Sequence, residues 1–457
     1  MHRRVRHLIA AGSTLAVLTG GASTASAVTP ELAEPGLDQL VGAPGAYDTG
    51  AIEFRFEEEG TVQLTPRNDQ AGQRFGTAVA LTQLHTISPR QFLVVTAPGL
   101  TVDGKENAGG LYVYERVGTT FEYLDLLTMD HPDVPGEAQA GAEFGRSMDV
   151  ASMEDHEPTT VTAGVPGLDV DGVQDAGGVI EMYLSRYVDD ELPSKSTLYT
   201  LADENSPRPP HAGDRLGEVV STRWWGAPSA TVNGQAEAGF VVQNRSYLET
   251  EFEIFHQGTK NIQGAPEAGD RFGSAIEVGE EVWIGVPGED VGTVRDAGMV
   301  NGLRSSEDTW DYGGSRAFTQ NTADDGSGKP VEGVAEAGDR FGSSVCQLWD
   351  DALYVGSPGE TIRDVVNAGS VTGLLGADSE SQETVGGTVS PHEEFGATVH
   401  CDSRWLQIGA PGYAADTGMV VYNPDPRSTK PWSRWRLQDG EPGDGYGSGR
   451  IAIEPVW

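Results

Sequence analysis

The chain alternates short hydrophobic runs with turns rich in Gly, Pro and Asp along almost its whole length. Runs of about four to six residues bounded in this way are typical of β-strands, and nothing after residue 27 sustains the 3.6-residue period of an amphipathic helix. The stretch 267–288, EAGDRFGSAIEVGEEVWIGVPG, shows the arrangement, with β-type runs at 274–278 and 282–286 joined by a tight turn at 279–281. The pattern predicts an all-β protein.

This stretch is one copy of a repeat in which a Phe-Gly signal alternates with a Pro-Gly signal about every 60 residues. The first signal, or a close variant, falls at Phe75, Phe144, Leu216, Phe272, Phe341, Phe395 and Tyr446. The second falls at Pro44, Pro98, Pro166, Pro228, Pro287, Pro358 and Pro411. Each unit continues with Ala-Gly or Thr-Gly and a further β-type run, and most Phe-Gly copies follow another such run. Four strands in each of seven units predict a seven-bladed β-propeller.

The two ends of the chain each hold half of a unit. Pro44 has no Phe-Gly signal before it, and Tyr446 has no Pro-Gly signal after it. Joined, they form one complete unit, with 450–453 as its first strand and 40–43 as its second. We therefore expect the ring to be closed by pairing of N- and C-terminal strands, the last blade being shared between residues 36–66 and 432–454. An open solenoid would leave both half-units unexplained.

These residues resemble the FG-GAP repeats of the integrin α-subunit N-terminal propeller, which also occur in secreted bacterial proteins. The clearest matches are Phe272-Gly273 with Gly285-Val286-Pro287, and Phe395-Gly396 with Gly409-Ala410-Pro411. The resemblance covers the chain from about residue 36 to its end. It implies a seven-bladed propeller that recognises other macromolecules.

Several blades of that family carry a calcium loop between the two signals, with alternating Asp residues. Here the same connections are the turns Gly279-Glu280-Glu281, Trp349-Asp350-Asp351 and Asp402-Ser403-Arg404. Such turns offer too few spaced carboxylates for the six to eight oxygen ligands of calcium. The resemblance alone would allow calcium, but these turns lack the family's calcium loop. We therefore expect no cofactor and assign no metal ligand.

The N-terminus has the features of a secretory signal peptide. Arg3, Arg4 and Arg6 precede a short apolar run at 8–18, and Ala25-Ser26-Ala27 fits a cleavage site. We expect cleavage between Ala27 and Val28, a signal peptide at 1–27, and a single secreted propeller at 28–457. The apolar run is too short for a membrane anchor, and no later stretch is long enough to span a bilayer.

Charge and cysteine content restrict the partners and the compartment. The 30 Lys and Arg against 69 Asp and Glu give a net charge of −39, which disfavours nucleic acid and anionic membranes. Cys346 and Cys401 fall five and six residues after their Phe signals, on equivalent strands of neighbouring blades. Export favours their oxidation to a disulfide, although the one-residue offset leaves open whether they face each other.

Two further features are candidates for binding. The loop after Pro-Gly carries acids at Asp169, Asp171 and Asp175 that look metal-like. The same loop elsewhere keeps an aliphatic residue and a polar residue before Ala-Gly, while its acids vary, which favours a structural role. Trp224-Trp225 could form a carbohydrate platform, but it lies where apolar strand residues are expected, so core packing is favoured.

Catalytic motifs are absent from the sequence: it has neither Gly-x-Ser-x-Gly nor His-Glu-x-x-His, and its acids are too numerous to nominate a general acid and base. We therefore predict that the chain is not an enzyme but a monomeric extracellular binding, recognition or scaffold module for a protein or carbohydrate ligand. The alternatives are a secreted propeller enzyme acting on polysaccharide or ester substrates, and a calcium-stabilised adhesin. Convergent ionisable residues in the central channel would favour the enzyme.

Overall fold

The computed structural model contains a compact unit spanning Pro35–Trp457. It describes residues 37–453 except 57–59, 83–90, 152–158, 185–191, 246–250, 280, 306–311, 349–351, 382–387, 402–404, 424–431, 436–445, 447 and 449. The predicted cleavage site at Ala27 and Val28 lies outside the described residues, as do the turns 349–351 and 402–404 and Glu280.

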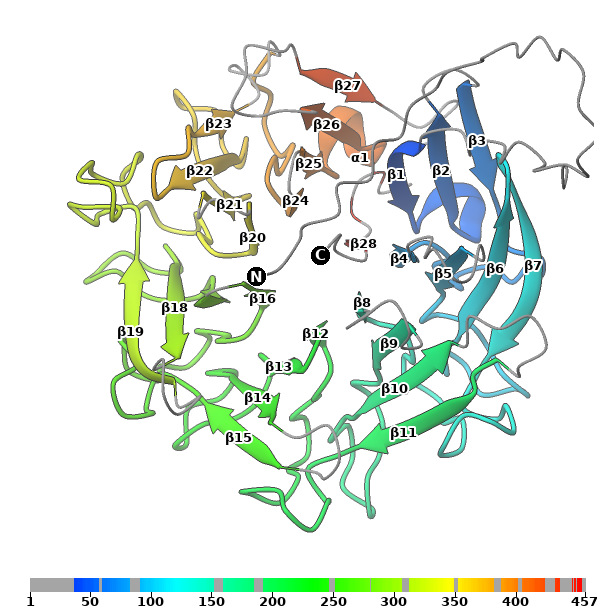
Figure 1. Ribbon diagram of the computed structural model, residues 1–457. Helices are drawn as coiled ribbons and strands as arrows, with labels where there is room; N and C mark the ends of the chain where they lie inside the picture. The colour runs from blue at the N-terminus through cyan, green and yellow to red at the C-terminus, as the bar shows by residue number, and fades with distance from the viewer. Residues whose placement is uncertain are drawn as a thin grey trace, which may run out of the picture. The chain divides into compact units, whose positions relative to one another are not determined.

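Seven sheets surround a common axis (Figure 1), so the prediction of an all-β seven-bladed propeller is confirmed. The first two comprise β1 (Leu37–Ala43), β2 (Ala51–Phe56) and β3 (Gly60–Leu64), then β4 (Ala78–Leu81), β5 (Phe92–Thr96), β6 (Leu111–Val117) and β7 (Thr120–Leu127). The next two comprise β8 (Met148–Ala151), β9 (Thr159–Gly164), β10 (Val179–Leu184) and β11 (Lys195–Tyr199), then β12 (Val219–Ser221), β13 (Trp224–Ala227), β14 (Phe240–Asn244) and β15 (Phe252–Phe255).

The remaining three sheets follow the same order from the axis outward. They comprise β16 (Ala275–Val278), β17 (Glu281–Val286), β18 (Met299–Ser305) and β19 (Tyr312–Phe318), then β20 (Ser344–Gln347), β21 (Leu353–Ser357), β22 (Ser370–Leu374) and β23 (Glu380–Ser381), then β24 (Thr398–Cys401), β25 (Leu406–Ala410), β26 (Met419–Asn423) and β27 (Ser433–Trp435). The short elements η1 (Ala46–Asp48) and α1 (Tyr413–Asp416) and the strand β28 (Arg450–Ile453) complete the order.

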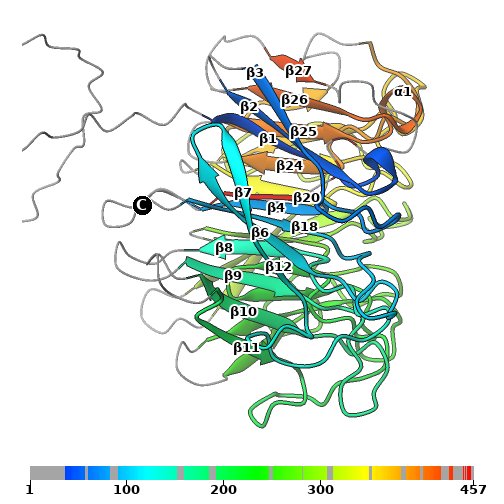
Figure 2. The same cartoon turned by 90° about the vertical axis from the view of Figure 1, so that its right-hand side faces the viewer.

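The strands run across the thickness of the ring, and the loops gather on its two faces (Figure 2). Each Phe-Gly signal precedes an innermost strand and each Pro-Gly signal follows the antiparallel second strand, so both lie on one face, here called the Phe-Gly face. The opposite face, where innermost strands end and second strands begin, is here called the hairpin face. Gly279, in one of the turns where the FG-GAP resemblance would place a calcium loop, belongs to the hairpin face.

The repeated signals are the contacts between successive blades. The Phe ring is fully buried, as at Phe341, and its backbone bridges Gly298 of the preceding blade's Ala-Gly signal. Gly285, in the Gly-Val-Pro signal, packs so closely on the next blade that a Cβ atom there would lie 1.9 Å from the carbonyl oxygen of Gly342. Gly342 itself has a φ of +93°, a conformation that favours glycine. All three signals are therefore explained by packing between blades.

The first and last described parts of the ring meet, but the strand pairing differs from the expected one. Tyr446 bridges Gly418 as five of the other six Phe-Gly signals bridge their glycines, and its hydroxyl donates a 3.0 Å hydrogen bond to Glu53 of β2. Strand β28 then pairs in parallel with β4 of the next blade, whereas antiparallel pairing with 40–43 was expected. Innermost strands all run in the same direction, so a strand displaced toward its neighbour meets that neighbour in parallel.

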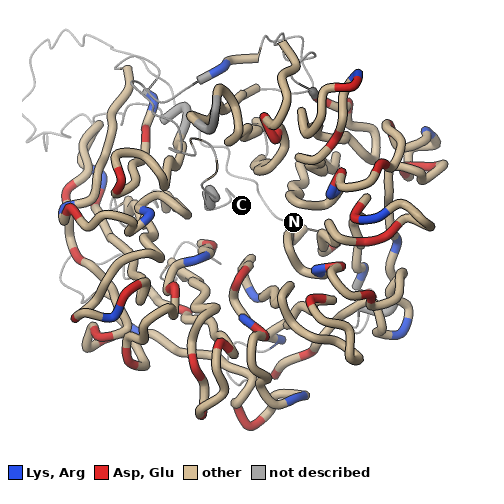
Figure 3. The backbone as a smooth tube through the Cα atoms, turned by 180° about the vertical axis from the view of Figure 1, so that it is seen from behind, with Lys and Arg blue, Asp and Glu red and all other residues tan. Residues whose placement is uncertain are grey.

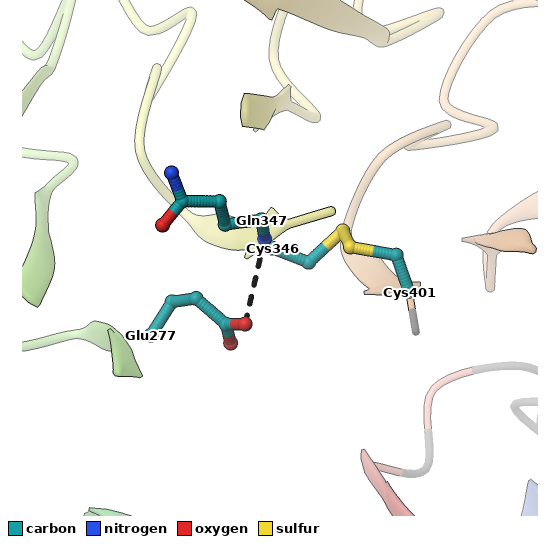
Figure 4. The surroundings of a disulfide bond; sticks show 4 residues. All are labelled: Glu277, Cys346, Gln347 and Cys401. Atoms are coloured by element: carbon teal, nitrogen blue, oxygen red, sulfur yellow. Dashed lines mark hydrogen bonds between the residues drawn. A yellow bond between two sulfur atoms is a disulfide. The ribbon is translucent and has the colours of Figure 1, made fainter. Parts of the chain in front are cut away.

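A disulfide joins Cys346 of β20 to Cys401 of β24, as expected, with a Cα–Cα distance of 5.8 Å. The bond links adjacent blades at their innermost strands (Figure 4). The one-residue offset does not separate the two side chains, because they belong to different sheets that face each other rather than to paired strands.

Replacing both cysteines by alanine is expected to lower the free energy of unfolding by about 2–4 kcal/mol, since the bond closes a loop of 55 residues. Urea unfolding of the oxidised protein and of the double variant measures this difference. Adding reductant should lower the stability of the oxidised protein to that of the variant and leave the variant unchanged. Equal stability of the two proteins under oxidising conditions would contradict the prediction.

Candidate functional site

The innermost strands carry their chemically distinctive side chains at one shared position, the fifth residue after the Phe-Gly aromatic or its Leu variant. In the six blades that begin with β4, β8, β12, β16, β20 and β24 this position holds Ala80, Asp149, Ser221, Glu277, Cys346 and His400, and in β28 it holds Ile451. Strands β4, β8, β12, β16, β20 and β24 surround the axis (Figure 1), so these residues form a circle around it. Two of them, Asp149 and Glu277, are carboxylic acids in blades separated by one blade.

Asp149 lies in β8 and is held by three hydrogen bonds. Its Oδ2 accepts from both the backbone N–H and the hydroxyl of Thr222, in the turn after β12, and its Oδ1 accepts from the N–H of Val150 at 2.9 Å. Burial raises the pKa of the Asp149 carboxyl, and these donors oppose the rise. The side chain is nevertheless half-buried, so one part of it remains accessible to solvent.

Glu277 occupies the matching place in β16. Its Oε1 accepts one long hydrogen bond, 3.4 Å, from the backbone N–H of Gln347 in β20 (Figure 4). The residue as a whole is half-buried, while burial of its carboxyl raises the pKa to about 8, with the negative charge of Asp149 adding to the rise. Glu277 is therefore protonated at neutral pH, while remaining partly exposed.

These contacts follow one rule of register. The fifth residue of one blade contacts the sixth residue of the next, as Asp149 contacts Thr222, Glu277 contacts Gln347 and Cys346 bonds to Cys401. The disulfide thus occupies the place that carboxylates take at other blade interfaces. The two acids form no motif in the sequence because they come from different blades, and only alignment of every blade on its Phe-Gly signal shows that they occupy the same position.

The residues that the sequence singled out elsewhere have structural contacts. In the loop after Pro-Gly, Asp169 Oδ1 accepts from the N–H of Asp175 at 2.9 Å, and Val170 bridges Val173, so the loop is bonded to itself. Trp224 and Trp225 are 3% and 0% exposed and lie in the core rather than on a platform.

The Arg residues of the Phe-Gly loops form ion pairs between blades. Arg74 and Arg215 come from two blades that flank a third, and each holds one oxygen of its Glu143 at 2.7 Å. Figure 3 shows acidic residues throughout the ring among fewer basic ones, in keeping with the net charge of −39.

A second acidic group lies on the Phe-Gly face. Glu336 and Asp339, in the loop before β20, and Glu360, after Pro358-Gly359, each place a carboxylate oxygen within 4.8 Å of the others. Burial raises the pKa of Asp339 to about 6 and that of Glu360 to about 7, and in both cases neighbouring acids add to the rise. Oxygen atoms this close repel one another when ionised.

Comparison with known proteins gives a fold-level result. No family model and no curated protein matches the chain. Among solved structures, it is similar to the periplasmic gluconolactonase PpgL of Pseudomonas aeruginosa, with a TM-score of 0.42 and 12% sequence identity over 89% of this chain and 97% of that one. No helix among the described residues is long and apolar enough to cross a membrane.

That finding corrects the expectation that the chain is not an enzyme, because the similar structure is an enzyme. At this identity and TM-score, the similarity assigns no activity to this chain. The expectation rested on the absence of a short catalytic motif, and a pair such as Asp149 and Glu277, assembled from separate blades, produces no such motif.

Proposed function

We propose that the protein is a secreted hydrolase of the FG-GAP propeller type that cleaves ester or polysaccharide substrates at the inner strands of its hairpin face. The observation that supports this best is the pair Asp149 and Glu277: two acidic residues, each half-buried, at equivalent positions of the innermost strands, where the charge of Asp149 adds to the rise in the pKa of Glu277. Hydrolysis of an ester or glycosidic bond needs one group to take a proton from water and another to give a proton to the leaving oxygen.

The environments of the two acids separate these roles. Burial raises the pKa of both carboxyls, but Asp149 accepts three hydrogen bonds that oppose the rise, so we assign it as the general base. Glu277 accepts one long bond and holds its proton to about pH 8, so it is the general acid. Two carboxyl groups in unequal hydrogen-bonding environments are a common basis of acid–base catalysis.

Charge restricts the substrate to neutral or cationic compounds, since a chain of net charge −39 repels polyanions. The N-terminal segment with Ala27 and Val28 supports export, and the Cys346–Cys401 bond suits an oxidising compartment. The repeated Phe-Gly and Pro-Gly signals support the FG-GAP assignment.

An assay of residues 28–457 against neutral polysaccharides, sugar lactones and p-nitrophenyl esters tests this function. We expect turnover of at least one class, with a rate that falls above about pH 8 as Glu277 loses its proton and falls in acid as Asp149 becomes protonated. A D149N/E277Q double variant purified in the same way detects contaminating hydrolases. Equal turnover by the double variant, or none by the wild type on any class, would rule the proposal out.

A further inference from the structure

We propose that the Phe-Gly face holds a divalent cation, calcium by its ligand chemistry, bound by Glu336, Asp339, Glu360 and the side-chain amide of Gln320. This site is separate from the carboxyl pair of the hairpin face. It also differs from the hairpin turns in which related repeats hold calcium.

The backbone brings the ligands together. The N–H of Gly359 donates to the carbonyl oxygen of Asp339 at 3.1 Å, and a Cβ atom at Gly359 would lie 1.8 Å from the carbonyl oxygen of Gly338. The turn after β21 therefore packs directly on the loop before β20, which places Glu360 beside Asp339. Three carboxylate oxygens within 4.8 Å of one another result from this contact.

Two buried oxygens at this place have no hydrogen-bond partner among the described residues. They are Oδ1 of Asp339, a residue that is 1% exposed, and Oε1 of Gln320, a residue that is 3% exposed. The Gln320 amide lies against the group, since its Nε2 donates to Glu360 Oε2. Buried polar atoms are rarely left unpaired, and rotation of the amide would turn Oε1 toward the carboxylates. Carboxylate and amide oxygens are the ligands that calcium takes.

A nearby blade has a positively charged partner for the Asp of its Phe-Gly loop, which Asp339 does not have among the described residues. Asp214 stands in its Phe-Gly loop where Asp339 stands here, and Arg208 supplies a cation to it at 2.6 Å. The residue at the place of Arg208 is Gly333, and no Lys, Arg or His in the described part of the chain forms an ion pair with Asp339. A bound cation would take the place of that guanidinium.

The same comparison applies to the other two ligands. Leu201 and Ala230 stand at the places of Gln320 and Glu360 in the blade of Asp214, and both are buried apolar residues. The positions of Gln320 and Glu360 thus tolerate buried apolar side chains in another blade of the same fold, so the fold itself does not require polar groups there. The next interface repeats the polar set, where Gln257 Nε2 donates to Glu289 Oε2 at 2.5 Å beside Asp270.

Calorimetric titration of chelator-treated protein, residues 28–457, with calcium chloride and with magnesium chloride tests the site. We expect calcium to bind and to raise Tm by a few degrees, because a ligand that binds only the folded state stabilises it. Magnesium should bind more weakly, because it demands a regular octahedral site.

Two variants locate the binding. Q320L/E360A reproduces the apolar pair of the nearby blade, and D339N removes one charge; each should bind one calcium ion fewer than the wild type. E332Q, which changes an exposed acid in the same loop, is the matched control and should bind as the wild type does. The absence of calcium binding by wild type, equal loss in E332Q, or unchanged stoichiometry in a folded Q320L/E360A would each overturn the proposal.

Discussion

Replacing Glu277 by Gln is expected to lower kcat/KM for the hydrolysed substrate by about 10²- to 10⁴-fold, the usual contribution of a general acid. Gln preserves the acceptor that faces the N–H of Gln347 but cannot transfer a proton. D149N should lower the rate by a similar factor, and the double variant should lose little more, since the two residues act in one proton-transfer sequence. Steady-state kinetics of the three variants measure these effects.

Measuring the thermal stability of the same variants distinguishes a catalytic role of Glu277 from a role in folding. Glu277 has a pKa of about 8 in the folded protein, above the ordinary 4.5, so the folded state binds the extra proton. The free energy of unfolding therefore includes a favourable contribution from protonated Glu277 at pH 4.5 and below. This contribution is lost as the pH rises toward 8, and it stays lost above that pH. E277Q should therefore unfold at a higher temperature than the wild type at pH 8.5, while losing activity.

The matched control is E122Q, an exposed acid on the outermost strand β7. It should leave both the rate and the pH dependence of Tm unchanged. Full activity in E277Q would rule out Glu277 as the acid. Loss of activity together with a lower Tm at pH 8.5 would show that the residue serves only to hold β16 to β20.

The fold was predictable because each unit repeats the residues that its contacts need. Phe-Gly, Ala-Gly and Pro-Gly signals mark where one blade packs on the next, and seven copies define the ring. The place of β28 was not predictable, because its sequence specifies a strand but not whether it pairs with β1 of its own blade or with β4 of the next. Pairing depends there on how closely the strands approach one another at the axis.

The candidate sites were harder to predict for a different reason. Asp149 and Glu277 occupy a position that holds Ala80 or Ser221 in other blades, so the repeat itself gives no signal there. Gln320 and Glu360 likewise differ from Leu201 and Ala230 in a sister blade. Both proposed sites lie where blades differ, and those differences can be recognised only once the register between blades is known.

The glycines of the repeat, by contrast, give the largest expected effect on stability. Changing Gly285 to Ala should lower the free energy of unfolding by about 3 kcal/mol or more, because overpacking against rigid backbone cannot be relieved by a rotamer change. The added Cβ would lie 1.9 Å from the carbonyl oxygen of Gly342 and 3.1 Å from the Cβ of Ala275. The strand carrying Gly285, β17, is buried along its whole length and cannot shift without moving its blade.

Gly104→Ala is the matched control for this change. Gly104 has a φ of +81° and open space where its Cβ would stand, so Ala there meets only the backbone penalty of about 1 kcal/mol. Urea unfolding of both variants compares the two costs directly. If G285A costs no more than G104A, the close approach of β17 to the next Phe-Gly loop does not hold the blades together, and the repeated glycine needs another explanation. A larger cost in G285A, with the m-value unchanged, would place the effect at the contact between blades.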